Sequence, residues 1–367
     1  MHVQGATSSD IVNKQIPQLG SGQQVITISS GGNDVGLVTI LNHCVYTWSA
    51  FNNDCDATIQ DTANQIANNL PSNLDSLLTA AKTKLDPAGT IYITGYGKFW
   101  DDTTTDCDKV SWHYWPWPIG WLTWQYLTQA RRTSMNNLVD AVNQQISNAA
   151  SRAGSSVVFV DFDKYYGDLA GRYCEPGVAE PDANRADLLF YESGTTEDTA
   201  MTKRDTEVLS NSTFEGQINY LVAQAIAENP NITFPDDSEI NKGVAASFLA
   251  TSPASGQLDF TLPSIISDTT KRVFHPMQIG HALIANLVLY YMSLTRASVL
   301  QTIAAAESEE AFGTCPADPR NVGCAAKDTL NVPTQFVLQN GTVDQADLLF
   351  MLRAGIDSFT CLEEHAD

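Results

Sequence analysis

Short apolar runs alternate with helical apolar spacing along the first half of the chain. Three runs rich in β-branched residues have the pattern of buried strands, at residues 24–30, 90–95 and 156–162. Two longer stretches between them place apolar residues on one helical stripe, at residues 61–85 and 127–150. Pro71 is expected to break or kink the first of these helices. The alternation of strand and helix predicts a parallel sheet with helices on both faces.

The C-terminal part of the chain is more irregular. A helical stretch is expected at residues 277–292, and two further ones at residues 297–310 and 344–354. We therefore expect one domain at residues 1–294 and a C-terminal helical extension, residues 295–367, packed on it.

The composition is that of a globular protein, with 43% hydrophobic and 17% charged residues in a chain of 367. Forty-two acidic side chains against twenty basic ones give a formal net charge of -22, which repels phosphate backbones and anionic lipid surfaces. This charge balance argues against a nucleic-acid partner. The apolar run at residues 282–292 is interrupted by Asn286 and is too short to cross a bilayer, so no membrane span is expected.

The cysteines and sequons indicate an oxidising compartment. None of the seven cysteines forms the CxxC pair of a zinc or redox motif, so disulfides are expected. Three sequons begin at Asn211, Asn231 and Asn340 and suit a glycosylated, secreted protein. Residues 1–5 have neither the basic nor the apolar region of a signal peptide.

Two polar motifs lie where a parallel sheet would place a site. Gly31-Gly32-Asn33-Asp34 follows a predicted strand, and His275-Pro276 precedes a predicted helix. Ligands of open parallel sheets bind beyond the carboxyl ends of the strands. An asparagine amide there can donate to an oxyanion, and a histidine can act as a general base. Each motif also has a purely structural interpretation, because Asn-Asp turns and proline at a helix start are both common.

In these motifs the chain resembles the SGNH (GDSL-like) hydrolases, especially secreted bacterial and fungal esterases and lipases. The similar segments are residues 5–10 for the second sequence block, 31–34 for the third, and 274–276 with Gly280 and His281 for the fifth. The resemblance spans residues 3–294 and implies disulfides between Cys44 and Cys55 and between Cys107 and Cys174. The pairing of the remaining cysteines, Cys315, Cys324 and Cys361, stays open.

The resemblance implies a three-layer α/β/α domain with a flavodoxin-like parallel sheet, and hydrolysis of a carboxylic ester by serine acylation without a cofactor. The Asn33 amide and the backbone N–H of Gly5 would donate to the oxyanion, and His275 would be the general base. The family usually has an aspartate three residues before this histidine, where Arg272 stands here. We expect the backbone carbonyl of Arg272 to orient the imidazole, with Asp268 as the alternative.

The first sequence block of the family, a strand that ends in Gly-Asp-Ser, has no counterpart in this sequence. The nucleophile serine is therefore missing, and we expect an N-terminally truncated chain that is inactive as written. In the family this first strand lies inside the sheet, between the second and third. Ser8 and Ser9 belong to the oxyanion block and are not expected to replace the nucleophile, and His281 is expected to be a structural partner. The alternative is that the chain is a non-catalytic descendant of this fold, whose function is to bind an ester or a glycan.

Five tryptophans crowd into residues 112–124, and they suit either an apolar substrate wall or a loop packed on the core. His113 with Asp106 and Asp108 lacks a metal-ligand spacing, so no metal is expected. We expect a monomer that takes a small-molecule, lipid or glycan ester.

Overall fold

The computed structural model describes residues 6–46, 54–112, 125–192, 194–196, 208–210, 219, 223, 261–263 and 272–304. The chain divides into two compact units, residues 1–275 and residues 276–367. The expected helix at 344–354, the three sequons and the cysteines at 315, 324 and 361 lie outside the described residues.

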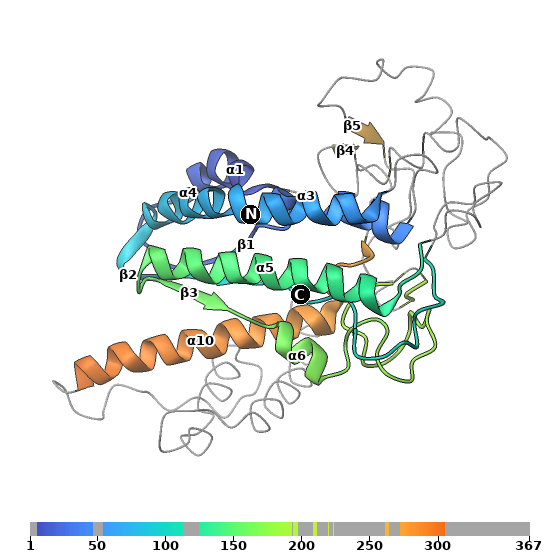
Figure 1. Cartoon of the computed structure of the whole chain (residues 1–367). Helices are drawn as coiled ribbons and strands as arrows, with labels where there is room; N and C mark the ends of the chain where they lie inside the picture. Colours follow the sequence, from blue (N-terminus) through green and yellow to red (C-terminus); the bar gives the residue numbers. More distant parts are fainter. Residues whose placement is uncertain are drawn as a thin grey trace. The chain divides into compact units, whose positions relative to one another are not determined.

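A three-stranded parallel sheet forms the centre of the first unit (Figure 1). Its strands are β1 (Gln23–Ser29), β2 (Leu85–Thr94) and β3 (Val157–Val160), hydrogen-bonded in that order. The predicted parallel sheet and its three strands are thus confirmed. β2 begins earlier than predicted, because Leu85 pairs with Gln23 before an irregularity in the register. A separate antiparallel pair, β4 (Val208–Ser210) and β5 (Thr261–Pro263), was not predicted.

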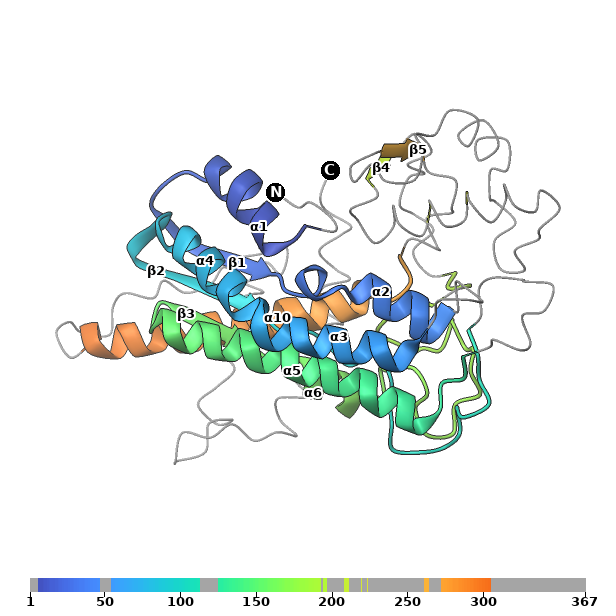
Figure 2. The same ribbon diagram turned by 45° about the horizontal axis from the view of Figure 1, so that its top comes forward.

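The long helices of the first unit are α3 (Cys55–Asn68), α4 (Leu70–Lys82) and α5 (Gln129–Ala153). They pack on one another, and α4 and α5 also pack on the sheet (Figures 1 and 2). The expected break near Pro71 is confirmed, since α3 ends before Asn69 and Pro71 lies in the first turn of α4. α4 turns Leu70, Leu74, Leu77 and Leu78 inward, each of them almost fully buried. The second helical layer of the three-layer arrangement stays a prediction.

The strand β1 pairs with β2 on one side, and among the described strands it has no neighbour on the other. It alternates buried residues, Ile26 and Ile28, with exposed ones, and Val25 retains 37% of its surface accessible. Because β1 leads into the Asn33 motif, its edge that is unpaired among the described strands is where the resemblance would put the family's first strand, and this assignment stays a prediction.

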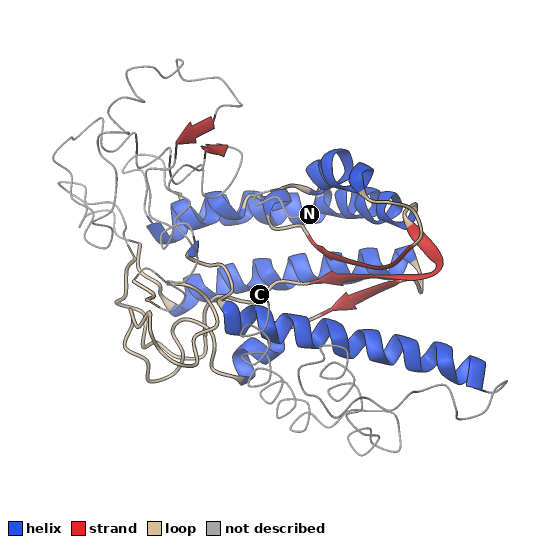
Figure 3. Ribbon diagram, turned by 180° about the vertical axis from the view of Figure 1, so that it is seen from behind, coloured by secondary structure: helices blue, strands red, loops and turns tan. Residues whose placement is uncertain are grey.

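Short helical segments connect these elements: α1 (Ser8–Asp10), η1 (Ile11–Gln15), η2 (Ile16–Gln18), η3 (Asn33–Val35), α2 (Leu37–Leu41), η4 (Asn42–Tyr46) and α6 (Asp163–Asp168). Described loops gather beyond the arrowheads of the strands, which mark their carboxyl ends (Figure 3). Two disulfides, Cys44–Cys55 and Cys107–Cys174, confirm the pairing that the resemblance implied.

In the described part of the second unit, one continuous helix, α10 (Gln278–Ala304), spans the stretch where a first helix at 277–292 and the start of a second at 297–310 were expected. The expected interruption was wrong because residues 293–296, Ser-Leu-Thr-Arg, contain no glycine or proline to end a helix. The domain boundary at residue 294 falls inside α10 and stays a prediction. Among the helices of the described residues, none combines the length and the hydropathy that a bilayer crossing needs.

Candidate functional site

The Asn33 turn begins directly after β1. Gly31 has a φ of 131°, a conformation that favours glycine, and it lets the chain turn into the short helix η3. Asn33 is exposed at this turn, and its amide nitrogen donates to the backbone carbonyl of Ala6 at 3.2 Å. The structure therefore brings the third and second sequence blocks side by side. Gly5, the second expected oxyanion donor, lies just outside the described residues.

Asp34 ties this turn to two other segments. Its carboxylate accepts hydrogen bonds from the backbone N–H and the hydroxyl of Ser8, both at 3.0 Å, and from the Asn73 amide of α4 at 2.9 Å. Ser8 is only 1% exposed, and its hydroxyl also lies 3.0 Å from that of Ser30. A hydroxyl that is buried and already bonded in this way gives Ser8 the geometry of a structural residue.

Tyr96, which follows β2, forms a further hydrogen bond with the Asn33 turn. Its buried hydroxyl accepts the backbone N–H of Gly32 at 3.0 Å. Burial raises the pKa of the Tyr96 phenol, so this group stays neutral at physiological pH. Sequence reasoning missed Tyr96, although its place beyond the carboxyl end of a predicted strand is the signal that could have found it.

His275 lies in a second turn whose backbone is strained. Phe274 has a φ of 69°, which is uncommon for a bulky residue, and its backbone N–H donates to the carbonyl of Tyr191 at 3.0 Å. The carbonyl of His275 accepts the Tyr191 N–H at 2.9 Å. The Nδ1 atom of the half-buried imidazole lies 3.2 Å from the carbonyl oxygen of Arg272. If Nδ1 carries the proton, Nε2 is the basic nitrogen of the ring.

The Arg272 side chain does not compete for this role. Its guanidinium lies over the ring of Tyr191, 5.6 Å from the centroid, while its backbone oxygen contacts His275. The orienting role expected for the Arg272 carbonyl stays a prediction. Asp268, the alternative, lies outside the described residues.

Both turns contact one loop beyond the carboxyl end of β2. Tyr96 in this loop holds the Asn33 turn, and Phe99, three residues later, makes an edge-to-face contact with Phe274 at 5.0 Å between ring centroids. Since Ser29 of β1 pairs with Thr94 of β2, this loop adjoins both strand ends. The two motifs therefore converge on the same segment of the sheet's carboxyl rim.

The Phe274 ring belongs to a buried aromatic cluster. Trp100, Tyr173 and Phe274 lie with centroids 5.6 to 6.4 Å apart, and Trp112 packs edge-on against Tyr173 at 4.8 Å. Of the tryptophan-rich segment, Trp112 thus packs on the core, and residues 113–124 lie outside the described residues. This cluster fixes the turn that carries His275.

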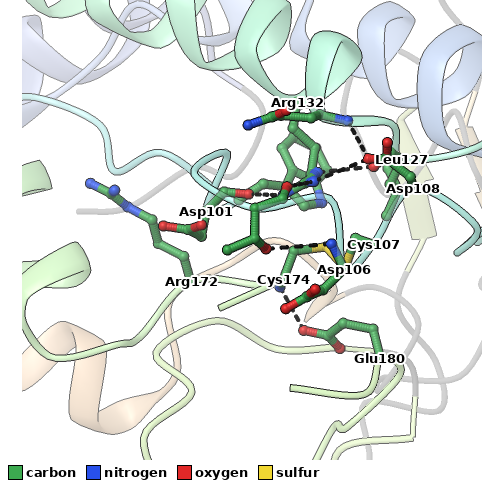
Figure 4. Close-up of a disulfide and its surroundings, with 12 residues drawn as sticks. Asp101, Asp106, Cys107, Asp108, Leu127, Arg132, Arg172, Cys174 and Glu180 are labelled. Atoms are coloured by element: carbon green, nitrogen blue, oxygen red, sulfur yellow. Dashed lines mark hydrogen bonds and ion pairs between the residues drawn. A yellow bond between two sulfur atoms is a disulfide. The ribbon is translucent and has the colours of Figure 1, made fainter. Parts of the chain in front are cut away.

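A fully buried arginine organises the loop after β2 (Figure 4). Arg132 of α5 is 0% exposed and donates to the backbone carbonyls of Asp101, Thr104 and Leu127 and to the carboxylate of Asp108. The Cys107–Cys174 disulfide fastens the same loop. The sequence did not reveal the role of Arg132, because arginine is rarely fully buried and one near a helix start is expected to be solvent-exposed. The carboxylates of Asp106 and Asp108 have protein partners, and His113 lies outside the described residues.

Glu192, next to Tyr191, is a buried acid that the sequence also did not reveal. It is 2% exposed, and neither carboxyl oxygen has a hydrogen-bond partner in the described part of the chain. Burial, with the nearby carboxylate of Glu180, raises the pKa of Glu192 from 4.5 to about 8. Glu192 is therefore largely protonated at neutral pH.

This raised pKa predicts a pH-dependent stability. The folded state favours the protonated acid, so its contribution to stability is complete below pH 4.5 and is lost as the pH rises toward about 8. The change Glu192→Gln should remove this loss, roughly 2–4 kcal/mol of unfolding free energy over that range. Thermal and urea unfolding across the range measure it, with the exposed Asp187→Asn as the charge-matched control. Parallel pH profiles for the parent and the Gln variant would refute the prediction.

The comparisons with known proteins place this chain near bacterial lipases. No family model matches it. Over 150 residues it is 27% identical to Lipase 1 of Streptomyces coelicolor, covering 41% of this chain and 48% of the relative. Over 96 residues it is 29% identical to a lipase of Streptomyces rimosus, covering 26% of this chain and 34% of the relative. The chain spans about half the length, or less, of these curated relatives.

Two solved structures are similar over about half of the chain. One is a phospholipase A1 from Streptomyces albidoflavus NA297, at 22% identity and a TM-score of 0.38, covering 51% of this chain and 65% of that one. The other is an extracellular lipase from Streptomyces rimosus, at 23% identity and a TM-score of 0.37, covering 47% and 63%. The chain thus has a distant sequence similarity to Streptomyces lipases, and its disulfides are consistent with secretion.

Proposed function

We propose that this chain carries the oxyanion donor and the general base of a secreted, serine-dependent carboxylic-ester hydrolase of the SGNH type. The observation that carries the proposal is the His275 imidazole, placed on a strained turn with Nδ1 against the Arg272 carbonyl. With its proton on Nδ1 and directed at this carbonyl, the ring would present Nε2 as the basic nitrogen. The distant similarity to lipases supports the same reaction class.

In the proposed reaction a serine hydroxyl adds to the ester carbonyl while Nε2 of His275 takes the hydroxyl proton. The side-chain amide of Asn33 donates to the resulting oxyanion, and His275 returns the proton to the leaving alcohol. Water then hydrolyses the acyl-serine by the same two groups. The sequence contains no Gly-Asp-Ser tripeptide, so no residue of this chain is assigned as the nucleophile.

On this proposal the chain as written binds an ester without turning it over, which is also what the non-catalytic alternative requires. Two proteins separate the two functions. One is the chain itself, and the other is a fusion in which a strand that ends in Gly-Asp-Ser, the first sequence block expected from the resemblance, precedes residue 1. A fluorophosphonate probe should leave the first unlabelled and label the added serine of the second. Labelling of any serine in the chain alone would contradict its assigned inactivity, and a correctly folded fusion without esterase activity would favour the non-catalytic binder.

In the active fusion, Asn33→Ala tests the oxyanion role. Loss of one such donor typically lowers the rate about 10²–10³-fold with little change in substrate binding. We expect this fall in kcat, with KM nearly constant, on a p-nitrophenyl ester. The matched control is Asn13→Ala, because Asn13 is also exposed and also donates a single 3.2 Å hydrogen bond, to Ser9. Equal rates in the two variants would mean that Asn33 only shapes its turn.

A further inference from the structure

Tyr173 connects the loop after β2 with the turn that carries His275. Its backbone N–H donates to the carbonyl of Phe99, and its own carbonyl accepts the N–H of Asp101, both at 2.8 Å. Through these two bonds the Tyr173 backbone lies beside the loop after β2 as a short parallel bridge. The same loop contacts the Asn33 turn, so Tyr173 is fixed to one half of the candidate site.

The side chain of Tyr173 reaches the other half of the site. It is fully buried, and its hydroxyl donates to the backbone carbonyl of Tyr191 at 2.5 Å. This carbonyl also accepts the Phe274 N–H at 3.0 Å, while the Tyr191 N–H donates to the carbonyl of His275 at 2.9 Å. The Tyr173 hydroxyl and the His275 turn therefore share one acceptor.

The loop to which Tyr173 is fixed is itself anchored to α5. Arg132 donates to the Asp101 carbonyl, and the Asn136 amide donates to the carbonyl of Trp100 at 2.9 Å. The disulfide of the next residue after Tyr173 fastens the same loop (Figure 4). Tyr173 thus presents its hydroxyl from an anchored segment.

The turn next to this hydrogen bond needs such support. Phe274 has a φ of 69°, and a bulky residue keeps this conformation only where its surroundings over-determine it. The contact between the Phe274 and Tyr173 rings constrains the side chain, whereas the Tyr191 carbonyl holds the Phe274 backbone N–H. Without the Tyr173 hydroxyl this buried carbonyl loses one donor, and its position is less well fixed.

We infer that Tyr173 is a positioning residue that sets the distance between the oxyanion donor Asn33 and the general base His275. The inference rests on the proposed function, and it assigns Tyr173 no contact with the substrate. In that reaction one serine meets the imidazole while the ester oxygen meets the Asn33 amide, so the two groups need a fixed separation. A misplacement of about 1 Å can lower a rate about 10²-fold.

The chain itself provides the first test, because the His275 tautomer reports the position of the ring. We expect the proton of neutral His275 on Nδ1, against the Arg272 carbonyl. Tyr173→Phe removes one oxygen atom, and it should lower the ratio of the Nδ1–H form to the Nε2–H form about 3–10-fold, the weight of one hydrogen bond. NMR spectra of protein with ¹⁵N-labelled histidine measure this ratio, and the signal lost in His275→Gln identifies the residue.

Tyr166→Phe is the matched control. Tyr166 is as fully buried as Tyr173 and also packs on Phe190, but its hydroxyl has no hydrogen-bond partner in the described part of the chain. Its loss should leave the His275 tautomer ratio unchanged. Equal changes in the two variants, or an unchanged ratio in Tyr173→Phe, would overturn the inference.

A second variant serves if Tyr173→Phe does not fold, as thermal unfolding will show. Replacing Tyr173 by para-fluorophenylalanine fills the vacated space with a fluorine atom, which cannot donate, so the hydrogen bond is lost without leaving a cavity. This variant should change the tautomer ratio in the same direction. A folded protein with the ratio of the parent would refute the positioning role.

The fusion that carries Gly-Asp-Ser provides the second readout. There Tyr173→Phe should lower kcat about 3–10-fold with KM nearly constant, while Tyr166→Phe should keep the parent kcat. A changed tautomer ratio together with an inactive fusion would support the positioning of His275 by Tyr173 and count against the proposed catalytic roles. An active fusion in which Tyr173→Phe keeps the parent kcat and tautomer ratio would remove the positioning role and leave the catalytic roles intact.

Discussion

Replacing His275 by alanine in the fusion that carries Gly-Asp-Ser is expected to lower kcat/KM about 10²–10⁴-fold, the usual contribution of a general base. The loss should appear in kcat, because the imidazole moves the proton and does not anchor the ester. Steady-state hydrolysis of a p-nitrophenyl ester measures both parameters.

Arg272→Ala is the matched control for this change. The group proposed to orient His275 is the backbone carbonyl of residue 272, which alanine retains, and the variant removes only the side chain stacked on Tyr191. We expect it to keep its rate within about tenfold of the parent. If this variant loses as much activity as His275→Ala, the group that orients the His275 imidazole is the Arg272 side chain and not the backbone carbonyl of residue 272.

Replacing Arg132 by alanine is expected to destabilise the chain by about 3–5 kcal/mol, the cost of breaking a buried charged network by removing one partner. The guanidinium is fully buried and donates at 2.6 Å to the Thr104 carbonyl and at 2.9 Å to that of Leu127. Its loss leaves these carbonyl groups without their donor and opens space beside the Cys107–Cys174 disulfide. Urea unfolding measures the change.

Arg152→Ala is the control on the same helix. Arg152 pairs with Asp75 at 2.8 Å, but both side chains are nearly half exposed, so this pair is worth only about 0–1 kcal/mol. Similar losses of stability in the two variants would show that the network around Arg132 does not hold the loop.

The sequence predicted those parts of the fold that local pattern determines. Runs rich in β-branched residues located β1, β2 and β3, and Pro71 located the break between α3 and α4. Helix ends were less predictable. α3 begins at Cys55 rather than at residue 61, because Asp54 caps it with a hydrogen bond to the Ala57 N–H at 2.9 Å.

In the candidate site too, some residues could be predicted from local sequence pattern and others could not. Asn33 and His275 could be proposed as candidates because they occupy element boundaries that can be read from the sequence. Tyr96, Arg132 and Glu192 were not, since their roles come from burial and from contacts between distant segments. The hydrogen bond from Gly32 to Tyr96 spans 64 residues, and no local pattern encodes such a partner.

The open edge of β1 matters for how the protein behaves in solution. Among the described residues no strand pairs with this edge, so it presents a row of N–H and C=O groups to any extended chain, and Val25 adds an exposed apolar side chain. Concentrated samples will favour association between copies through this edge. A lysine at position 25 would act as a gatekeeper against such stacking, as charges on natural edge strands do.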